Sequence, residues 1–285
     1  MKSICLRSPA KLNLSLHVAG KRPDGYHNLS TLFEKINFFD DIRLTLRKDK
    51  RIRIFCNWPG VPKGPKNLAY KAAQVLQKDF QVSNGVDIHI KKRIPIAAGL
   101  AGGSSNAATT LLGLNRLWRL NLTEKRLVSY AKQIGSDVPL FIYKYIWCLG
   151  AERGDRIKSV NLSKKTWHIL IIPGIKVYSN EVFRAFKMKL TKRKDNVNIL
   201  TRALREGTCE KVGGLLSNDL EAAIVRVHPL LLRIKNNIEY ITGLKVCFSG
   251  SGPSIFGVVK SEKEAKRMQS ILSDRYKQVF VVRTL

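Results

Sequence analysis

The sequence predicts an α+β fold with two domains. Segments with the alternating pattern of strands come in groups, and helical segments separate the groups. A doubly wound sheet would instead alternate strand and helix regularly. The chain has 285 residues, 44% of them hydrophobic, which is enough for one large domain or two modest ones. Because Glu152–Lys165 is charged and interrupted by glycine, we expect two consecutive domains, 1–160 and 161–285.

In the first half, residues 12–18 alternate apolar and polar side chains, which predicts a half-buried strand. The turn residues of Gly20–Tyr26 predict a loop or hairpin after it. Asn67 and Thr123 are expected helix N-caps. The other elements expected here are strands at Ile36–Phe39, Ile42–Leu46, Ile52–Phe55 and Val86–Ile90, and helices at Asn67–Phe80, Asn106–Trp118 and Thr123–Ile134.

The second half repeats this mixture of strands and helices. Pro173 and Gly174 end a buried strand, and a basic stretch, Lys187–Lys194, follows a short helix. The expected strands are Trp167–Ile172, Leu244–Phe248, Ile255–Val259 and Gln278–Val282, and the expected helices are Ser179–Phe186, Val197–Glu206, Glu221–Tyr240 and Ser261–Ser273. No internal repeat is visible.

The composition restricts the class of protein and its partners. The 51 Lys and Arg residues outnumber the 21 Asp and Glu residues, and the net charge of +30 favours an anionic partner. The five cysteines form no CxxC pair, which argues against a disulfide framework or a zinc site. No apolar run approaches the ~18 residues of a membrane span. We therefore expect a cytoplasmic protein with no membrane partner.

The segment Pro95–Ser105 carries the clearest chemical pattern. Its three glycines permit a close approach of the backbone to a ligand, and the helix that follows presents free N–H groups and a positive dipole end. Two serines in the first turn add hydroxyls suited to a phosphate oxygen or Mg²⁺. The segment has neither Walker A nor GxGxxG spacing. It predicts a phosphate-binding loop, and the alternative is a glycine-rich helix start packed for steric reasons.

Two further segments resemble site material. Ser249–Pro253 lies between two expected strands and offers small residues and N–H groups, so it is either an anion-binding nest or a simple turn. Asp137 lies at an expected helix start, where the helix dipole stabilises a carboxylate. On the residues alone it is either a site carboxylate or an ordinary charge in the first turn of a helix.

Five blocks in this order resemble the GHMP kinase superfamily. They are Ser8–Leu14 (SPAKLNL), Arg22–His27 (RPDGYH), Pro95–Ser105 (PIAAGLAGGSS), Gly135–Pro139 (GSDVP) and Ser249–Pro253 (SGSGP). The resemblance runs from about Ser8 to Val259, which is nearly the whole chain. The glycine-rich and SGSGP blocks are shared across the superfamily, whereas the first two blocks are typical of members that phosphorylate a cytidine diphosphate-linked alcohol.

The resemblance implies a fold and a reaction. The fold would pair an N-terminal domain like the second domain of ribosomal protein S5 with a ferredoxin-like C-terminal domain. The reaction would transfer the γ-phosphoryl group of ATP, with Mg²⁺, to the 2-hydroxyl of 4-diphosphocytidyl-2-C-methyl-D-erythritol. Both reactants are polyanions, which gives part of the positive charge a use.

The resemblance also implies catalytic and nucleotide-binding roles. Lys11 and Asp137 match the catalytic pair: Asp137 would accept the proton of the acceptor hydroxyl, and Lys11 would keep Asp137 ionised and oriented. Asn67 and Lys92 match positions near the adenine, and Ser105 is also expected to hold Mg²⁺. The loop expected to bind ATP comprises Pro95, Ile96, Ala97, Ala98, Gly99, Leu100, Ala101, Gly102, Gly103, Ser104 and Ser105.

For the acceptor substrate, Tyr26 and His27 match residues that hold cytosine by stacking and hydrogen bonding. Asn13 is expected to contact the diol end of the substrate, and Phe183 is a candidate second aromatic beside the base. The block at Val177–Asn180 departs from the family pattern. Further substrate contacts are expected from Gly250, Ser251 and Gly252.

Two alternatives remain open. One is another small-molecule kinase of the superfamily, acting on homoserine, mevalonate or a sugar; the RPDGYH block argues against it, since those substrates have no base to hold. The other is a nucleic-acid-binding protein on an S5-like scaffold, which the charge of +30 motivates. The basic residues are not interleaved with aromatics as in an RNP motif, so no specific nucleic acid is expected. Monomer and dimer are both compatible with the sequence.

Overall fold

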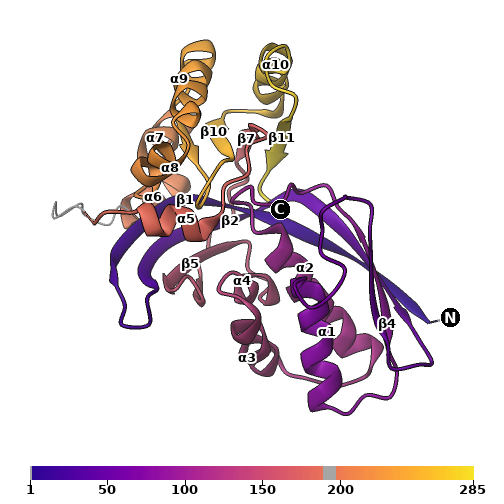
Figure 1. The fold of residues 1–285 in the computed structure, drawn as a ribbon. Coiled ribbons are helices and arrows are strands. Elements are labelled where there is room, and N and C mark those ends of the chain that lie inside the picture. Colours follow the sequence, from indigo (N-terminus) through magenta and orange to yellow (C-terminus); the bar gives the residue numbers. More distant parts are fainter. Residues whose placement is uncertain (1, 189–196) are drawn as a thin grey trace. The chain divides into compact units, whose positions relative to one another are not determined.

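The computed structural model describes residues 2–188 and 197–285, so residues 189–194 of the basic stretch lie outside the described residues. The chain divides into two compact units, each assembled from several segments (Figure 1). Unit 1 comprises Met1–Ala10, Phe38–Ile96 and Ala101–Lys144, and unit 2 comprises Lys11–Asn37, Ala97–Leu100 and Tyr145–Leu285. The division into consecutive domains, 1–160 and 161–285, stays a prediction.

The long strand β1 (Ser3–Lys21) confirms the predicted strand but not its exposed polar face. Residues 10–16 are all buried, Asn13 and Ser15 included. These polar side chains are hydrogen-bonded inside unit 2: Asn13 Nδ2 donates to Thr31 Oγ1 at 2.8 Å, and Ser15 Oγ accepts from Leu32 N at 3.3 Å. The prediction of a half-buried strand is therefore wrong, because internal partners allow the polar face to be buried.

The strand β2 (His27–Leu46) replaces two predicted strands and the turn between them. Asp40 and Asp41 indicated a turn, yet both lie within the strand. The Asp40 carboxylate is fully buried and bonds to residues more than 50 positions away in the chain. The predicted turn is wrong because the acceptor capacity that usually makes a local Asx turn is used here for long-range contacts.

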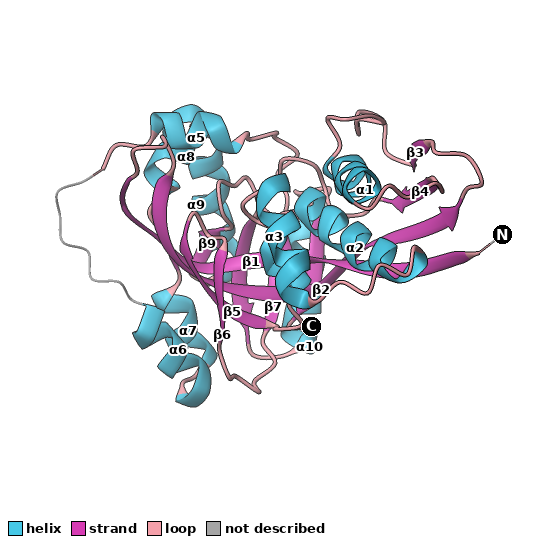
Figure 2. Cartoon of the chain, turned by 90° about the horizontal axis from the view of Figure 1, so that it is seen from below, coloured by secondary structure: helices cyan, strands magenta, loops and turns pink. Residues whose placement is uncertain are grey.

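In unit 1, strands β3 (Ile52–Cys56) and β4 (Val86–Lys91) pair in parallel, and β4 pairs antiparallel with the second half of β2. Helices α1 (Leu68–Asp79), α2 (Gly102–Leu117) and α3 (Glu124–Ile134) pack against one another (Figures 1 and 2). The predicted Asn67 cap is confirmed, since its side-chain oxygen accepts from Ala69 N at 2.9 Å. Helix α2 begins four residues earlier than predicted. The short helix α4 (Val138–Ile142) completes the unit.

In unit 2, strands β5 (Trp147–Glu152), β6 (Arg156–Ser159) and β8 (Ser217–Asn218) were not predicted. They extend the sheet of β1 and β2: β5 pairs with β2, β6 with β5, and β8 with β1. Helices α5 (Ser179–Ala185) and α6 (Val197–Glu206) were predicted, and α7 (Cys209–Leu215) was not.

A second sheet in unit 2 has the order β11-β7-β10-β9, all antiparallel. Its strands are β7 (Trp167–Ile171), β9 (Val246–Phe248), β10 (Ile255–Val259) and β11 (Val279–Arg283). Helices lie between β7 and β9 and between β10 and β11, which makes the βαββαβ order of a ferredoxin-like fold. The ferredoxin-like expectation is confirmed.

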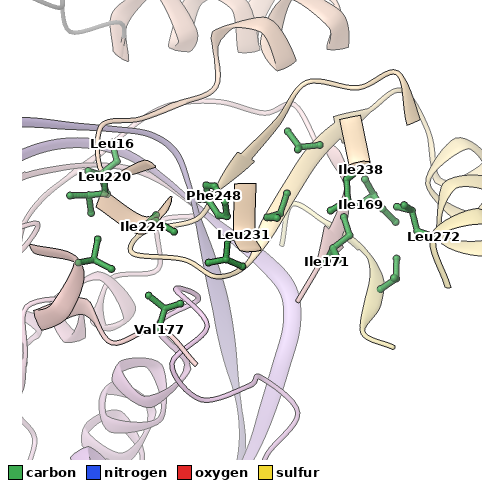
Figure 3. Packing of buried hydrophobic residues seen from close by; sticks show 14 of the residues in the cluster. Leu16, Ile169, Ile171, Val177, Leu220, Ile224, Leu231, Ile238, Phe248 and Leu272 are labelled. Atoms are coloured by element: carbon green, nitrogen blue, oxygen red, sulfur yellow. The ribbon is translucent and has the colours of Figure 1, made fainter. Parts of the chain in front are cut away.

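Helices α8 (Glu221–Val227), α9 (Leu230–Thr242) and α10 (Glu262–Ser273) bury their apolar faces with this sheet. Figure 3 shows Ile169, Ile171 and Phe248 of the strands gathered with Leu231, Ile238 and Leu272 of the helices. The single helix predicted over Glu221–Tyr240 is wrong: the chain breaks at His228–Pro229 because proline lacks the N–H that continues a helix. No helix among the described residues has the length and apolar character to cross a bilayer.

Candidate active site

The backbone of the glycine-rich loop is strained. Ala97, Gly99 and Ala101 all have positive φ, at 53°, 73° and 55°. Glycine adopts this conformation freely, but each alanine that does so costs on the order of 1 kcal/mol. Such strain is found where surrounding structure imposes it, often at sites that bind a ligand. The prediction that this loop is more than a tight turn is consistent with its backbone.

The carbonyl groups in the centre of the loop accept hydrogen bonds from other residues of unit 2. Those of Ala97 and Ala98 accept from the N–H groups of Val177 and Ser254, each at 3.4 Å. The carbonyl of Gly99 accepts from Ser249 Oγ at 3.2 Å, and that of Leu100 accepts from Lys11 N at 3.2 Å. The loop therefore lies against the Ser249–Pro253 segment and against Lys11, two blocks that the sequence analysis selected separately.

The first turn of α2 leaves its N–H groups free. Ala101 precedes the helix and makes no side-chain cap, and the N–H groups of Gly102, Gly103 and Ser104 have no acceptor among the residues that the structure describes. Gly103 is exposed, and a Cβ placed there would meet nothing within 4 Å. Uncapped N–H groups at the positive end of a 16-residue helix form a place for an anion such as phosphate.

The two serines of this turn differ in accessibility. Ser105 is fully buried, and its hydroxyl accepts from Ser8 Oγ at 2.8 Å. The expectation that Ser105 holds Mg²⁺ is not supported by this placement, because an ion bound to nucleotide phosphates must be reachable from solvent. Ser104 is half-buried, and it is the hydroxyl of the pair that a ligand can reach.

The side chains of Lys92 and Asn67 both bind other groups of the protein. Both residues are expected near the adenine. The Lys92 ammonium forms a buried ion pair with Asp40; burial lowers the pKa of Lys92, and the Asp40 charge partly opposes this. The Asn67 amide caps α1 and donates to the Pro62 carbonyl at 2.8 Å. A direct contact of either side chain with a nucleotide stays a prediction.

Three predicted site residues lie together in unit 2. Lys11 is buried and its ammonium donates to Asn13 Oδ1. A Cβ on Gly250 would lie 3.2 Å from Lys11 Nζ and 3.3 Å from Asn13 Oδ1, so only glycine fits closely beside this pair. Asn13 N also donates to Ser249 Oγ at 3.3 Å. The structure thus brings the predicted catalytic lysine and two predicted substrate contacts into one cluster.

The Ser249–Pro253 segment is hydrogen-bonded to Asn218, a residue that was not predicted from the sequence. Asn218 Nδ2 donates to the carbonyls of Phe248 and Gly250, at 2.9 and 2.7 Å. Gly250 and Gly252 have positive φ, and the Ser251 hydroxyl is 2.8 Å from that of Ser179. No local signal marked Asn218, because its partners lie about 30 residues further along the chain.

Asp137 belongs to unit 1, immediately before α4. It is half-buried, and its side chain makes no capping hydrogen bond. Because α4 has only five residues, its dipole is small, which weakens the view of Asp137 as a mere charge at a helix start. Lys11 belongs to unit 2, and the expected pairing of Lys11 with Asp137 stays a prediction.

The predicted aromatic residues form a cluster in unit 2. The His27 ring is stacked on Phe183 with centroids 5.3 Å apart, and Phe186 meets it edge-on at 5.8 Å. Burial lowers the pKa of His27, and the nearby Lys21 charge lowers it further. A neutral imidazole offers one donor and one acceptor, which suits the polar edge of a base.

Tyr26 is half exposed and is held by two charged neighbours. Asp24, paired with Arg22 at 3.1 Å, accepts from Tyr26 N at 3.1 Å and fixes the turn. The Arg153 guanidinium lies 5.2 Å from the centre of the Tyr26 ring and is anchored by Asp155 at 2.8 Å. Sequence reasoning missed Arg153, because the β5–β6 hairpin that carries it was not predicted.

Comparisons with known proteins agree with the motifs. A family model described as GHMP kinases N terminal domain matches residues 67–145, and one described as GHMP kinases C terminal matches residues 200–278. A 4-diphosphocytidyl-2-C-methyl-D-erythritol kinase of Alkaliphilus metalliredigens is 37% identical over 284 residues, 100% of this chain and 97% of that protein. One of Bacillus velezensis is 40% identical over 279 residues, 98% of this chain and 96% of that protein.

A solved structure extends this likeness to three dimensions. A crystal structure of a 4-(cytidine 5′-diphospho)-2C-methyl-D-erythritol kinase superposes with a TM-score of 0.82 at 30% identity. The match covers 99% of this chain and 100% of that one. A match of this extent spans both units of the chain.

Proposed function

This chain belongs to the family of 4-diphosphocytidyl-2-C-methyl-D-erythritol kinases, and on that premise we propose that it transfers the γ-phosphoryl group of ATP to the 2-hydroxyl of 4-diphosphocytidyl-2-C-methyl-D-erythritol. It has the two-domain GHMP kinase fold. The observation that carries the choice of acceptor is the stacking of His27 on Phe183, because a base needs an aromatic and polar edge to hold it. Tyr26, the neighbour of His27 in the chain, adds a half-exposed aromatic ring beside Arg153.

In the proposed mechanism the protein positions the reactants and balances charge. The free N–H groups of Gly102, Gly103 and Ser104 bind ATP phosphates. Lys11 and Asn13 hold the acceptor end of the substrate, and Asp137 orients the 2-hydroxyl and takes its proton. As the new O–P bond forms, the bond between the γ-phosphorus and the β–γ bridging oxygen breaks, and ADP leaves with that oxygen. Phosphoryl transfer with a loose transition state depends chiefly on such positioning.

Mg²⁺ would enter with ATP as part of the substrate. Among the described residues, no group of three or more His, Cys, Asp or Glu side chains could hold a metal ion. The half-buried Ser104 hydroxyl, in the first turn of α2, would supply one oxygen ligand to an ion that the phosphates otherwise hold. Neutralising phosphate charge is the chemistry that the ion supplies.

We also propose residues 1–160 and 161–285 as the N- and C-terminal kinase domains, and a cytoplasmic location. The two family models fall on opposite sides of residue 160, which supports the division. The pathway supplied by this reaction is the non-mevalonate route to isoprenoid precursors. The net charge of +30 exceeds what two polyanionic reactants need. Among the described residues, the only buried lysines and arginines are Lys11, Lys35 and Lys92, so most of this charge lies at the surface.

Replacing Tyr26 or His27 with alanine is expected to raise KM for the cytidine substrate and to leave the ATP dissociation constant unchanged. A base-stacking contact is worth about 1–3 kcal/mol, so the expected rise is roughly 5- to 150-fold. Steady-state kinetics with each substrate varied in turn measures both values. A larger effect on ATP than on the cytidine substrate would mean that this cluster does not hold the base.

A panel of acceptors separates the proposed function from the other kinases of the superfamily. With ATP and Mg²⁺, we expect turnover of the cytidine substrate and none of homoserine, mevalonate or a hexose. Strong turnover of any of these three would contradict the assignment. For the nucleic-acid alternative, tight RNA binding that persists in a salt titration would be the contrary result, since nonspecific phosphate contacts weaken steeply with salt.

A further inference from the structure

A buried carboxylate in unit 1 has no part in the mechanism proposed above. Asp40 lies in the middle of β2 and is fully buried. Its Oδ1 accepts from Arg93 N at 2.7 Å and from Ile94 N at 2.9 Å. Its Oδ2 accepts from Asn106 Nδ2 at 2.8 Å and pairs with the Lys92 ammonium. Four donors fill the four lone-pair sites that a carboxylate offers.

These donors come from the two ends of the glycine-rich loop. Residues 92–94 directly precede Pro95, and Asn106 directly follows Ser105. Asn106 also donates to Ser8 Oγ at 2.9 Å, and this hydroxyl in turn donates to Ser105. A Cβ on Gly102 would lie 2.8 Å from both Lys92 Nζ and Ile94 Cγ2. The entrance of the loop is therefore packed directly against the first turn of α2.

The backbone geometry at the start of α2 depends on these contacts between the two ends of the loop. Ala101, next to Gly102, is held at positive φ, a conformation that persists only where the surroundings impose it. The free N–H groups of Gly102–Ser104 must keep their direction to meet phosphate oxygens. A displacement of about 1 Å in such a constellation can cost on the order of 100-fold in rate.

We propose that Asp40 is a positioning residue for ATP: by joining residues 92–94 to Asn106, it closes the glycine-rich loop and fixes the phosphate-binding turn of α2. This rests on the proposed use of ATP. Asp40 itself touches no substrate. Its charge is needed because three of its four partners are the buried Lys92 ammonium and the two N–H groups, of Arg93 and Ile94, that lead into the loop.

The test is Asp40→Asn, which keeps the size of the side chain. An amide has only one accepting oxygen, and its NH₂ group would face donors of the protein. The variant therefore leaves the Lys92 cation unpaired and removes hydrogen bonds that hold one end of the loop. We expect the ATP dissociation constant, measured by calorimetry without acceptor, to rise by about 10-fold or more. KM for ATP rises with it, while KM for the cytidine substrate stays unchanged. A merely structural carboxylate would not produce this split.

Asp87→Asn is the matched control. Asp87 lies near the start of β4, at the end away from the loop, and is paired with Arg47 at 2.9 Å. The same substitution removes a carboxylate–cation pair from the same unit. It is expected to lower Tm and to leave the ATP dissociation constant at the wild-type value.

A second variant, Asn106→Ala, tests the proposal if Asp40→Asn does not fold. Asn106→Ala removes one donor to Asp40, and the ATP dissociation constant should rise by about 2- to 10-fold, the worth of one hydrogen bond. An unchanged ATP dissociation constant in the folded variant, or an equal rise of KM for both substrates, would overturn the proposal. If the wild-type protein binds ATP but does not phosphorylate the cytidine substrate, the acceptor assignment fails and the loop closure is still decided by ATP binding.

Discussion

Replacing Asp137 with asparagine is expected to lower kcat by ~100-fold or more, the usual scale for a positioned acid–base group. Asparagine keeps the size and hydrogen bonding of the side chain but lacks its charge and cannot accept the proton of the acceptor hydroxyl. ATP binding should survive, because the N–H groups of the α2 turn hold the nucleotide. Steady-state kinetics and a melting curve measure the two effects separately.

Lys11→Met should produce a similar loss of kcat if Lys11 and Asp137 act as a pair. The double variant should then be little worse than either single one, since groups that act as a unit are not additive. The contrary result is a wild-type kcat with a lowered Tm in Asp137→Asn. That outcome would leave Asp137 as a charge before α4, worth ~0.3–1 kcal/mol of stability.

Gly103→Val is expected to abolish ATP binding without unfolding the protein. A Cβ at this exposed position meets no protein atom within 4 Å, so the added side chain would conflict only with a phosphate that approaches the backbone. Gly102 is a poorer choice, because a Cβ there lies 2.8 Å from Lys92 Nζ and Ile94 Cγ2. Calorimetry with ATP gives the affinity, and a thermal melt shows that the variant is folded.

Two glycines serve as controls for that experiment. Gly214 in α7 is also exposed and helical, and a Cβ there would have nothing within 4 Å. Gly214→Val should therefore show the same general loss of stability from valine in a helix, with the wild-type affinity for ATP. Gly99→Ala should instead destabilise the fold, since its Cβ would lie 2.1 Å from the Ser249 carbonyl oxygen. Wild-type ATP affinity in Gly103→Val would mean that the loop is only a tight helix start.

Local signals in the sequence were reliable for this protein. The side chains of Asn67, Thr123 and Ser261 each accept an N–H of the first turn of the helix that was predicted to begin there. The loop predicted over Gly20–Tyr26 is present but starts two residues later, at Arg22, because β1 continues to Lys21. The predicted strands of the ferredoxin-like sheet are also present. Each of these features depends on side chains within a few residues of one another, which is the range that a sequence pattern reports.

The errors came from long-range partners. Asp40 and Asp41 are residues typical of turns, and their distant partners explain why β2 continues through them. Asp40 binds Lys92 and Asn106, 52 and 66 residues away, and Asp41 pairs with Arg93, 52 residues away. Arg153 and Asn218 were not predicted for the same reason. Arg153 lies over the ring of Tyr26, and Asn218 donates to the Gly250 carbonyl of the Ser249–Pro253 segment. The single helix predicted over Glu221–Tyr240 took no account of Pro229, although the proline marks the break.

Phosphorylation of the proposed acceptor can be measured by an ADP-release assay with product analysis. The purified protein is mixed with ATP, Mg²⁺ and 4-diphosphocytidyl-2-C-methyl-D-erythritol, with omission of the acceptor as the control. We expect acceptor-dependent release of ADP and an equal amount of product that carries a new phosphate on the 2-hydroxyl. Absence of acceptor-dependent ADP release from folded, ATP-binding protein, or a phosphate on another hydroxyl, would contradict it.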